Sequence, residues 1–129
     1  MNLSLSKKVL QGTVDLVRSK SITNRLLIMQ ALAGLGGTIH EVSKAKDSQT
    51  LQHILKQLKE TNEVQVLDVG PAGTCFRFLT AFLAQRAGKY VLTGSERMKQ
   101  RPIGPLVDAL HTLGASIEYL ESEGFPPLA

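Results

Sequence analysis

The sequence predicts an α/β fold built from stacked strand–helix units. Segments in which apolar residues alternate, as in a strand, follow segments in which they recur every three or four residues, as in a helix. The expected helices begin near Ser21, Asp47, Gly73 and Pro102, at intervals of 26, 26 and 29 residues. The residues themselves do not repeat, so ordinary βαβ alternation without repeat symmetry stays open. A length of 129 residues fits one domain.

Four helices are expected along the chain. In the first, Ile22, Leu26 and Met29 have helical spacing, and the glycines that begin at Gly34 end it. In the second, leucines and an isoleucine lie on one face and lysines on another. The last has a proline in its first turn and Gly114 just past its end, which is typical of helices. The predicted ranges are 22–35, 47–60, 74–86 and 102–113.

Short apolar runs predict the strands that alternate with these helices. The first run is extended with a kink at Gly12, and Gly88 precedes a later one. The predicted strand ranges are 9–17, 38–42, 64–69, 90–93 and 116–120. The end of the chain, residues 125–129, shows no clear element.

Composition excludes several classes of protein. A single cysteine cannot form an intramolecular disulfide, and no apolar run approaches the roughly 18 residues of a membrane span. No signal-peptide pattern is visible, so a cytoplasmic protein without membrane contact is expected. Lys and Arg number 15 against 11 Asp and Glu, and the net charge of +4 suggests an anionic partner. With no Trp, two Tyr and four Phe, the chain has too few aromatic rings for a typical single-strand nucleic-acid binder.

The first candidate site lies where a helix begins, just after residue 19. Lys20 and Ser21 stand at the turn, and Arg25 lies one helical turn beyond Ser21 on the same face. Lysine supplies a point charge, and arginine supplies a flat fork that suits a carboxylate or a phosphate. The alternative interpretation is a serine cap with solvated basic side chains.

A second turn between strand and helix carries glycines. Gly70 and Gly73 would let a ligand approach the backbone closely, and Thr74 can cap the helix. A tight, capped turn without a ligand is the alternative. Cys75 has no histidine near it in the sequence, so it is expected to pack in the interior rather than to act as a nucleophile.

A cationic loop precedes the last helix. Arg97, Lys99 and Arg101 stand at alternate positions there, and they could clamp an anion or simply be solvated. Arg97 and Arg101, together with Lys20 and Arg25, would line a site where strand ends meet helix starts, the usual place for ligands in α/β folds. This favours a multiply anionic small metabolite over nucleic acid, for which no binding motif is visible. The three histidines have no ligand spacing, so no metal site is expected.

Three segments of the chain resemble the enolpyruvyl transferase family. SKSITNR (19–25) is similar to the family's amino-terminal Lys-Ser signature, and GPAGTCFR (70–77) is similar to its Asn-Ala-Gly-Thr loop. LTGSERMKQRPIGPLVDAL (92–110) resembles its Arg-Met-x-x-Arg-Pro-Ile-Gly segment closely. The resemblance runs from about residue 20 to residue 128.

Within this family the chain resembles the members that act on shikimate-3-phosphate. Members that act on UDP-N-acetylglucosamine have Asn where Ser21 stands, and they have a Cys in the loop that corresponds to 94–101, where this chain has none. Pro71 and Phe78 depart from the family pattern, which usually has Asn and Pro at these positions.

The resemblance implies a reaction. These family members transfer the enolpyruvyl group of phosphoenolpyruvate to the 5-hydroxyl of shikimate-3-phosphate and release phosphate. Neither a metal nor an organic cofactor is needed. The groups that act as general acid and base are expected beyond Ala129, so no catalytic residue of this kind is expected within the chain.

The resemblance also implies a role for each candidate residue. Lys20 would contact both substrates. Ser21 and Arg25 would hold shikimate-3-phosphate, whereas the backbone N–H of Gly73 and the guanidinium of Arg101 would hold phosphoenolpyruvate. The residues expected to support the loops are Thr74, Arg77 and Arg97.

Finally, the resemblance implies that the chain is the amino-terminal part of a two-domain enzyme, because family members are several times longer. Residues 1–17 would be hinge strands or strands of the other domain. Residues 18–129 would hold the first repeated βαβαββ units of an inside-out α/β barrel, incomplete here. The remainder of the enzyme is then the expected partner. Without it residues 1–17 would lack their natural partner, and the apolar surface left exposed could drive self-association. A stand-alone phosphometabolite-binding module without catalysis is the alternative.

Overall fold

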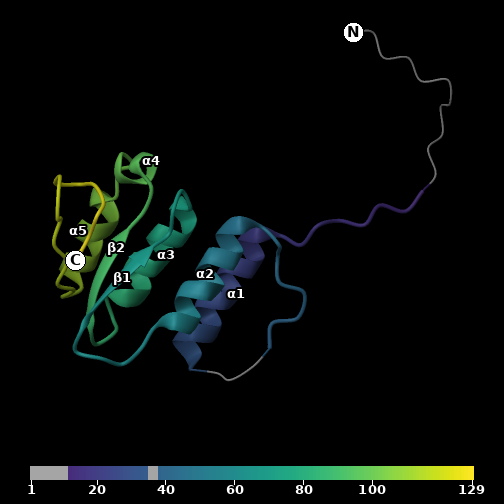
Figure 1. Ribbon diagram of the computed structural model, residues 1–129, viewed down its shortest axis with the longest axis horizontal. Coiled ribbons are helices and arrows are strands. Elements are labelled where there is room, and N and C mark those ends of the chain that lie inside the picture. Colours follow the sequence, from purple (N-terminus) through teal and green to yellow (C-terminus); the bar gives the residue numbers. More distant parts are fainter. Residues whose placement is uncertain (1–11, 35–37) are drawn as a thin grey trace, which may run out of the picture.

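The computed structural model describes residues 12–34 and 38–129, and within them five helices accompany a pair of parallel strands. Figure 1 shows α1 and α2 side by side, then α3, then the strands, with α5 on the side away from α1. The elements are α1 (Lys20–Ala33), α2 (Lys46–Gln57), β1 (Val64–Asp68), α3 (Gly73–Leu83), β2 (Lys89–Thr93), α4 (Glu96–Lys99) and α5 (Gly104–Thr112).

The two strands form a parallel pair that is joined through α3. Their register runs from Val64 opposite Lys89 to Asp68 opposite Thr93. Parallel strands cannot be joined by a tight hairpin, and α3 provides the crossover that they need. The carboxyl ends of both strands therefore lie at the same edge of the sheet, at the upper end of the molecule in Figure 1. This arrangement confirms the predicted α/β class.

Helix α3 is the centre of the hydrophobic core. Its sequence, GTCFRFLTAFL, is apolar on several sides, and seven of its 11 residues are buried. It contacts α1, α2, α5 and β2. A helix that is apolar nearly all round is stable only when it is covered in this way. The contacts of α3 with these four elements therefore determine the position of its amino end.

The last residues of the chain pair with β2. Leu128 and Leu92 exchange backbone hydrogen bonds of 2.8 and 3.0 Å, and Leu128 also lies opposite Tyr119 in an antiparallel bridge. The predicted strand at 116–120 therefore forms only an isolated bridge. Conversely, residues 125–129, for which the sequence predicts no element, supply the pairing.

The helices follow the sequence prediction more closely than the strands do. All four predicted helices are present, and Gly34 ends α1 with a φ of 60°; the glycines after it lie outside the described residues. The strands predicted at 64–69 and 90–93 are confirmed. The prediction for 38–42 is wrong, since these residues form a turn, with Glu41 at a φ of 60°. Helix α4 lies in a stretch predicted as a loop.

The prediction of a strand at 9–17 is also wrong where it can be judged. Residues 12–17 have no regular structure, and 9–11 lie outside the described residues. A strand is stable only when a neighbouring strand takes up its backbone hydrogen bonds. No strand of the described chain pairs with 12–17, and Val14, Leu16 and Val17 are exposed.

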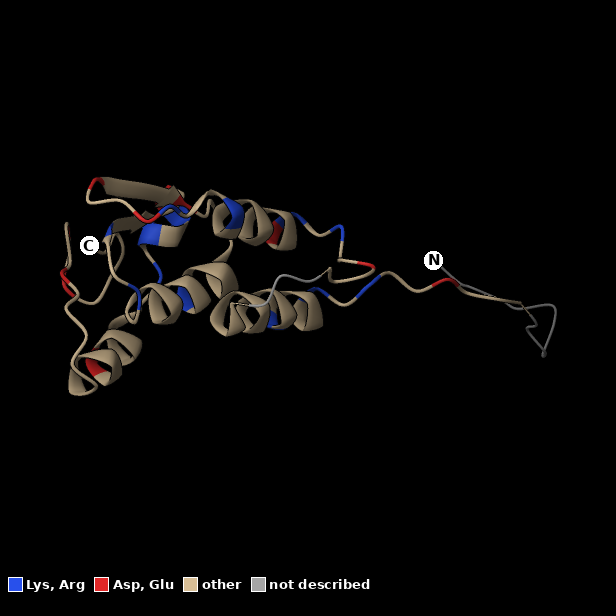
Figure 2. Ribbon diagram, turned by 90° about the horizontal axis from the view of Figure 1, so that it is seen from below, with Lys and Arg blue, Asp and Glu red and all other residues tan. Residues whose placement is uncertain are grey.

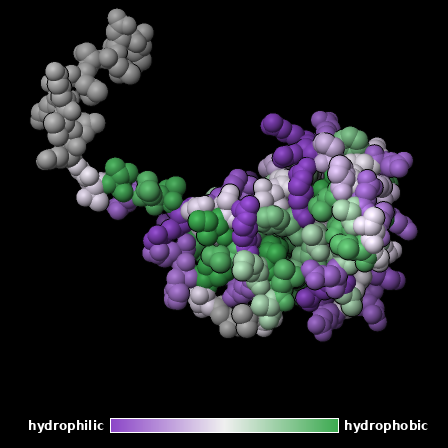
Figure 3. Space-filling view, turned by 180° about the vertical axis from the view of Figure 1, so that it is seen from behind, coloured by the Kyte–Doolittle hydropathy of each residue, from purple (hydrophilic) through white to green (hydrophobic). Residues whose placement is uncertain are grey.

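Helix α1 has one buried face and one exposed apolar face. Thr23, Asn24 and Leu27 are buried against the other helices. On the opposite side, four apolar side chains are 41% to 62% exposed, and Figure 3 shows hydrophobic side chains gathered on this face. The exposed residues of this α1 stripe are Ile22, Leu26, Met29 and Leu32. Among the described residues, none of the helices has the length and apolar character that crossing a membrane requires.

A substitution at Gly94 tests how closely the loops after the two strands approach each other. A Cβ at this position would lie 2.5 Å from the Gly70 carbonyl oxygen, which also accepts the Ser95 N–H at 3.1 Å. Because a backbone atom cannot swing away, we expect Gly94→Ala to lower the free energy of unfolding by about 1–3 kcal/mol in urea. Gly12→Ala, where nothing lies within 4 Å, is the control and should change little. Equal stability of the two variants would contradict this packing.

Candidate functional site

The amino ends of α1, α2 and α3 meet at the end of the molecule where the strands end. Lys20 in the first turn of α1 donates a hydrogen bond from Nζ to Asp47 Oδ2 in the first turn of α2, at 3.0 Å. The Cys75 thiol of α3 donates to the Asp47 carbonyl oxygen at 3.1 Å. The three helices therefore present their positive dipole ends to the same region, which favours anions there.

The Lys20–Asp47 contact is an ion pair at the rim of this region. Both side chains are partly exposed, so the pair adds little to stability. It does hold the Lys20 ammonium beside the amino end of α2. The sequence prediction missed Asp47. Its position as the acidic residue in the first turn of a predicted helix was the available signal.

Gly73 and Arg101 are brought into direct contact. Gly73 begins α3, and a Cβ built on it would lie 2.5 Å from Nη1 and 3.1 Å from Nη2 of Arg101. The guanidinium therefore lies against the backbone of the first turn of α3, a place that only glycine leaves open. The turn before it is tight, because Gly70 has a φ of 56° and its N–H donates to Asp68 Oδ1 at 2.7 Å.

The amino end of α3 has no side-chain cap. The residue before the helix, Ala72, offers no acceptor, and the Gly73 N–H donates to the Pro71 carbonyl oxygen at 3.0 Å. The predicted use of the Gly73 N–H for a ligand would need this turn to open. Since the first N–H groups of a helix have no partner within it, those of Thr74 and Cys75 depend on groups from outside α3.

Arg77 ties the start of α3 to the segment before α5. Its Nη2 donates to the Pro102 carbonyl oxygen at 2.8 Å, and its Nη1 donates to the Gly73 carbonyl oxygen at 3.4 Å. Pro102 follows Arg101 directly, so the same bridge limits where the Arg101 side chain can go.

The remaining predicted residues are exposed at the same end. Arg25 donates to the Ser21 carbonyl oxygen at 3.1 Å, and its guanidinium lies 5.9 Å from the centroid of the Phe78 ring of α3. Ser21 and Thr74 are exposed. Arg97 on α4 is exposed too, and within the described residues it has no ion pair or hydrogen-bond partner.

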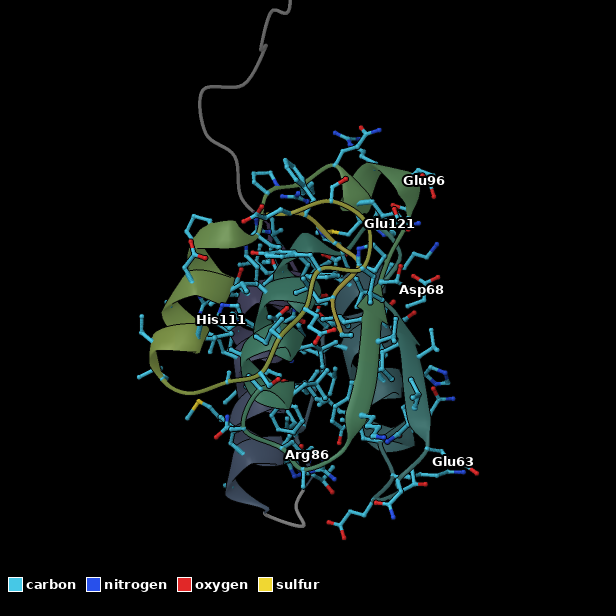
Figure 4. All side chains as sticks on the ribbon, turned by 90° about the vertical axis from the view of Figure 1, so that its left-hand side faces the viewer. Glu63, Asp68, Arg86, Glu96, His111 and Glu121 are labelled. Atoms are coloured by element: carbon cyan, nitrogen blue, oxygen red, sulfur yellow. The ribbon has the colours of Figure 1, made fainter. Side chains whose placement is uncertain are left out.

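Lys99, which the sequence places in the same cationic loop, has a different environment. Its Nζ lies 2.8 Å from Glu121 and 3.6 Å from Glu96. The hydrogen bond to Glu121 raises the pKa of Lys99 and keeps its charge paired. Figure 4 shows Glu96 and Glu121 near each other at this end. Lys99 thus holds α4 to the carboxyl-terminal segment, and Arg97 and Arg101 are the cations left to meet a ligand.

Charges of both signs are spread over the described chain. Figure 2 shows Lys and Arg interspersed with Asp and Glu over the helices, strands and loops. Of the cations in the candidate site, Lys20 and Arg25 lie in the first two turns of α1, and Arg101 lies against the first residue of α3. No group of three or more His, Cys, Asp or Glu side chains that could hold a metal lies among the described residues.

An open groove of about 640 Å³ lies elsewhere. It runs between the end of α3, the start of β2 and the carboxyl-terminal residues, with Leu83, Tyr90 and Ala129 in its mainly apolar lining. Arg86 also lines it, and Figure 4 shows Arg86 at the opposite end from Asp68 and Glu96. None of the predicted site residues lines this groove, and we place the candidate site at the helix amino ends.

Cys75 is a packing residue. Its side chain is fully buried, and burial raises the pKa of the thiol from its usual 9.0 to about 11, an effect to which the Asp47 charge adds and which Lys20 opposes. A thiol that stays protonated and inaccessible is a poor nucleophile.

The Cys75 pKa predicts how stability changes in alkali. In the unfolded chain the thiol loses its proton near pH 9, whereas in the folded chain it keeps it until about 11, so stability falls as the pH rises between these values. We expect this effect to remove about 2 kcal/mol between pH 9 and pH 11. Urea unfolding of the wild type and of Cys75→Ala at several pH values measures it. Tyrosines and lysines titrate in both proteins, so the difference between the two stability curves reports the thiol alone. Parallel stability curves would contradict the assignment.

Three comparisons with known proteins bear on the site. The family model described as EPSP synthase (3-phosphoshikimate 1-carboxyvinyltransferase) matches residues 6–66 and 59–129. A 3-phosphoshikimate 1-carboxyvinyltransferase of Bacteroides fragilis is 48% identical over 119 residues, which cover 92% of this chain and 28% of that protein. One from Vibrio cholerae is 43% identical over 145 residues, covering 94% and 33%.

A solved structure has the same fold. The EPSP synthase from Acinetobacter baumannii superposes with a TM-score of 0.75 at 18% identity, over 91% of this chain and 31% of that one. The chain therefore spans about a third of the length of the proteins that it matches.

Proposed function

The chain belongs to the EPSP synthase family, and from this premise we propose that it carries part of the substrate site of a 3-phosphoshikimate 1-carboxyvinyltransferase. The reaction would transfer the enolpyruvyl group of phosphoenolpyruvate to the 5-hydroxyl of shikimate-3-phosphate and release phosphate. The observation that carries the proposal is the contact between Arg101 and Gly73 at the uncapped amino end of α3.

Phosphoenolpyruvate would bind at this contact. Its carboxylate and phosphate are both anions, and the planar guanidinium of Arg101 can bind either through two parallel hydrogen bonds. The amino end of α3 adds backbone N–H groups and a positive dipole. Arg77 would keep the loop in place through its hydrogen bond to Pro102. An added Cβ at Gly73 would displace Arg101, so the glycine itself shapes the site.

Shikimate-3-phosphate would bind at the first turns of α1. Ser21 offers an exposed hydroxyl group, and Arg25 is held by the Ser21 carbonyl oxygen and the Phe78 ring, with its guanidinium exposed. Lys20 would give up part of its hydrogen bonding to Asp47 and contact both substrates instead. Thr74 and Arg97, exposed at the same end, would support the closing loops.

The chemistry that these residues supply is orientation and charge. In the reaction, the 5-hydroxyl loses its proton and its oxygen bonds to C2 of phosphoenolpyruvate, while the electrons of the C2=C3 double bond take up a proton at C3. The bond from C2 to the phosphate oxygen then breaks, phosphate leaves with that electron pair, and C3 loses a proton, which restores the double bond in the enolpyruvyl product. Fixed cations and N–H dipoles reduce the repulsion between two anionic substrates and stabilise the departing phosphate. The proton transfers would be made by groups that this chain does not contain.

The proposal extends to the organisation of the whole enzyme. Residues 18–129 would form the first units of one domain, residues 1–17 would belong to the hinge or to the other domain, and the remaining two thirds of the family's length would complete the site. The free thiol of Cys75 suits a reducing compartment, which supports a cytoplasmic enzyme.

The 129-residue chain by itself should be inactive. The groups proposed to transfer protons would lie in the remaining two thirds of the family's length, so we expect no steady release of phosphate from phosphoenolpyruvate and shikimate-3-phosphate, and only weak binding of either. A colorimetric phosphate assay of the purified chain measures this. Sustained turnover by the chain alone would overturn the proposed division of the site.

Arg101 can be tested in a chimera in which this chain replaces the matching part of the Bacteroides fragilis relative. We expect Arg101→Ala to raise the KM for phosphoenolpyruvate about tenfold to a hundredfold, because a hydrogen bond to a charged group is lost. The KM for shikimate-3-phosphate should change much less.

Arg86→Ala is the matched control for this experiment, since it also removes a guanidinium but at the other end of the molecule. It should leave both constants unchanged. Equal effects of Arg101→Ala on the two substrates would contradict the proposed split of roles. A chimera that binds both substrates without turnover would indicate a binding module.

We also propose that the isolated chain self-associates through the α1 stripe, whose four apolar side chains are exposed. Sedimentation velocity should show a concentration-dependent rise in mass, and replacing Ile22 and Met29 by Gln should abolish it. Substituting Gln for Val64 and Val66, exposed apolar residues on β1, is the control and should have no effect. A clean monomer at high concentration would count against this proposal.

A further inference from the structure

Three polar side chains meet inside the core just behind the candidate site. Asn24 of α1, Ser48 of α2 and Cys75 of α3 are each 0% exposed. The Ser48 hydroxyl donates to Asn24 Oδ1 at 2.8 Å, and Asn24 Nδ2 lies 4.0 Å from the Cys75 sulfur. The Cys75 thiol in turn donates to the Asp47 carbonyl oxygen. This buried Asn24–Ser48–Cys75 cluster therefore joins three helices through directional contacts.

A cluster of this kind specifies geometry rather than adding much stability. Burying polar groups is costly unless they are hydrogen-bonded, and no buried side-chain nitrogen or oxygen of the described residues lacks a partner. Apolar packing permits small rotations and shifts of one helix against another. A hydrogen bond between two helices does not, because its distance and angle must both be kept. The cluster thus defines the rotation of each helix about its axis at its amino end.

Each member of the cluster lies next to proposed substrate-binding residues. Asn24 is one helical turn after Lys20 and directly before Arg25, and Cys75 directly follows Gly73 and Thr74. Ser48 follows Asp47, the partner of Lys20. Fixing the cluster therefore fixes the backbone from which both substrates would be held.

We propose that Asn24 and Ser48 are positioning residues for the reaction, and this inference rests on the proposed function. They would hold the first turns of α1 and α2 in place against α3, so that Lys20 and Arg25 face the anion site at Gly73. Neither side chain would contact a substrate, because both are fully buried.

The test uses the 129-residue chain in solution. Residual dipolar couplings of backbone N–H groups report the orientations of α1, α2 and α3 relative to one another. They are measured in the wild type, Ser48→Ala and Asn24→Leu. Ser48→Ala removes a single oxygen atom, so it keeps the test open if Asn24→Leu does not fold. Each protein is also titrated with millimolar phosphoenolpyruvate and shikimate-3-phosphate. The amide chemical shifts of residues 20–25 and 73–77 then show how each substitution changes substrate binding.

Thr80→Val is the matched control. Thr80 is also buried and polar, but its hydroxyl donates within α3, to the Phe76 carbonyl oxygen at 2.9 Å, and joins no second helix. It should lower the stability in urea about as much as Ser48→Ala does, while leaving helix orientations and ligand-induced shifts as in the wild type. We expect Ser48→Ala to reorient α1 or α2 against α3 and to weaken binding at least threefold.

The outcomes separate this inference from the proposed function. Unchanged couplings in Ser48→Ala, or binding equal to that of Thr80→Val, would overturn the positioning role. If the wild type shows no shifts at 20–25 and 73–77 with either substrate, the proposed function of these segments fails, and the couplings alone then decide whether the cluster orients the helices.

Discussion

The burial of α3 is the constraint on which the other features of this structure depend. Because α3 is the crossover between two parallel strands, its amino end must lie at the edge where both strands end. Its apolar sequence then draws α1 and α2 against it with their amino ends at the same place. The candidate site is thus a consequence of packing, because the packing of the three helices brings the cations at their amino ends close together. A bound anion would reduce the electrostatic repulsion between these cations.

Some of the cations near the candidate site are paired with carboxylates, and others are not. Lys99 is neutralised by two glutamates, and Lys20 is partly neutralised by Asp47. Arg101 lies against a helix end whose dipole is also positive, so its charge is not compensated by that contact. Within the loop between β2 and α5, these differences leave Arg97 of α4 and Arg101 as the cations without an ion pair, and Arg101 lies at the start of α3. The same fold therefore supplies both the ion pairs that hold the loops and the charge that would hold a substrate.

The sequence predicts the helices well because their signals are local. Spacing of apolar residues and the glycine after α1 lie within each helix or beside it. The strand predicted at 9–17 is absent over its described part, 12–17, and the one predicted at 116–120 forms only a bridge, because a strand needs a partner, which no local pattern reveals. The sequence also identifies the arginines, but it cannot show that Arg101 lies on Gly73 or that Asn24 meets Ser48, since these contacts join residues far apart in the chain.

The central claim is that the guanidinium of Arg101 and the amino end of α3 together bind phosphoenolpyruvate. The most direct measurement is a crystal structure of the chimera with the Bacteroides fragilis relative, soaked with phosphoenolpyruvate and shikimate-3-phosphate. The account predicts a carboxylate or phosphate oxygen about 3 Å from an Arg101 guanidinium nitrogen, with a backbone N–H of the first turn of α3 as a second donor. Both substrates bound with Arg101 turned away to solvent, or bound in the groove beside Tyr90, would contradict it.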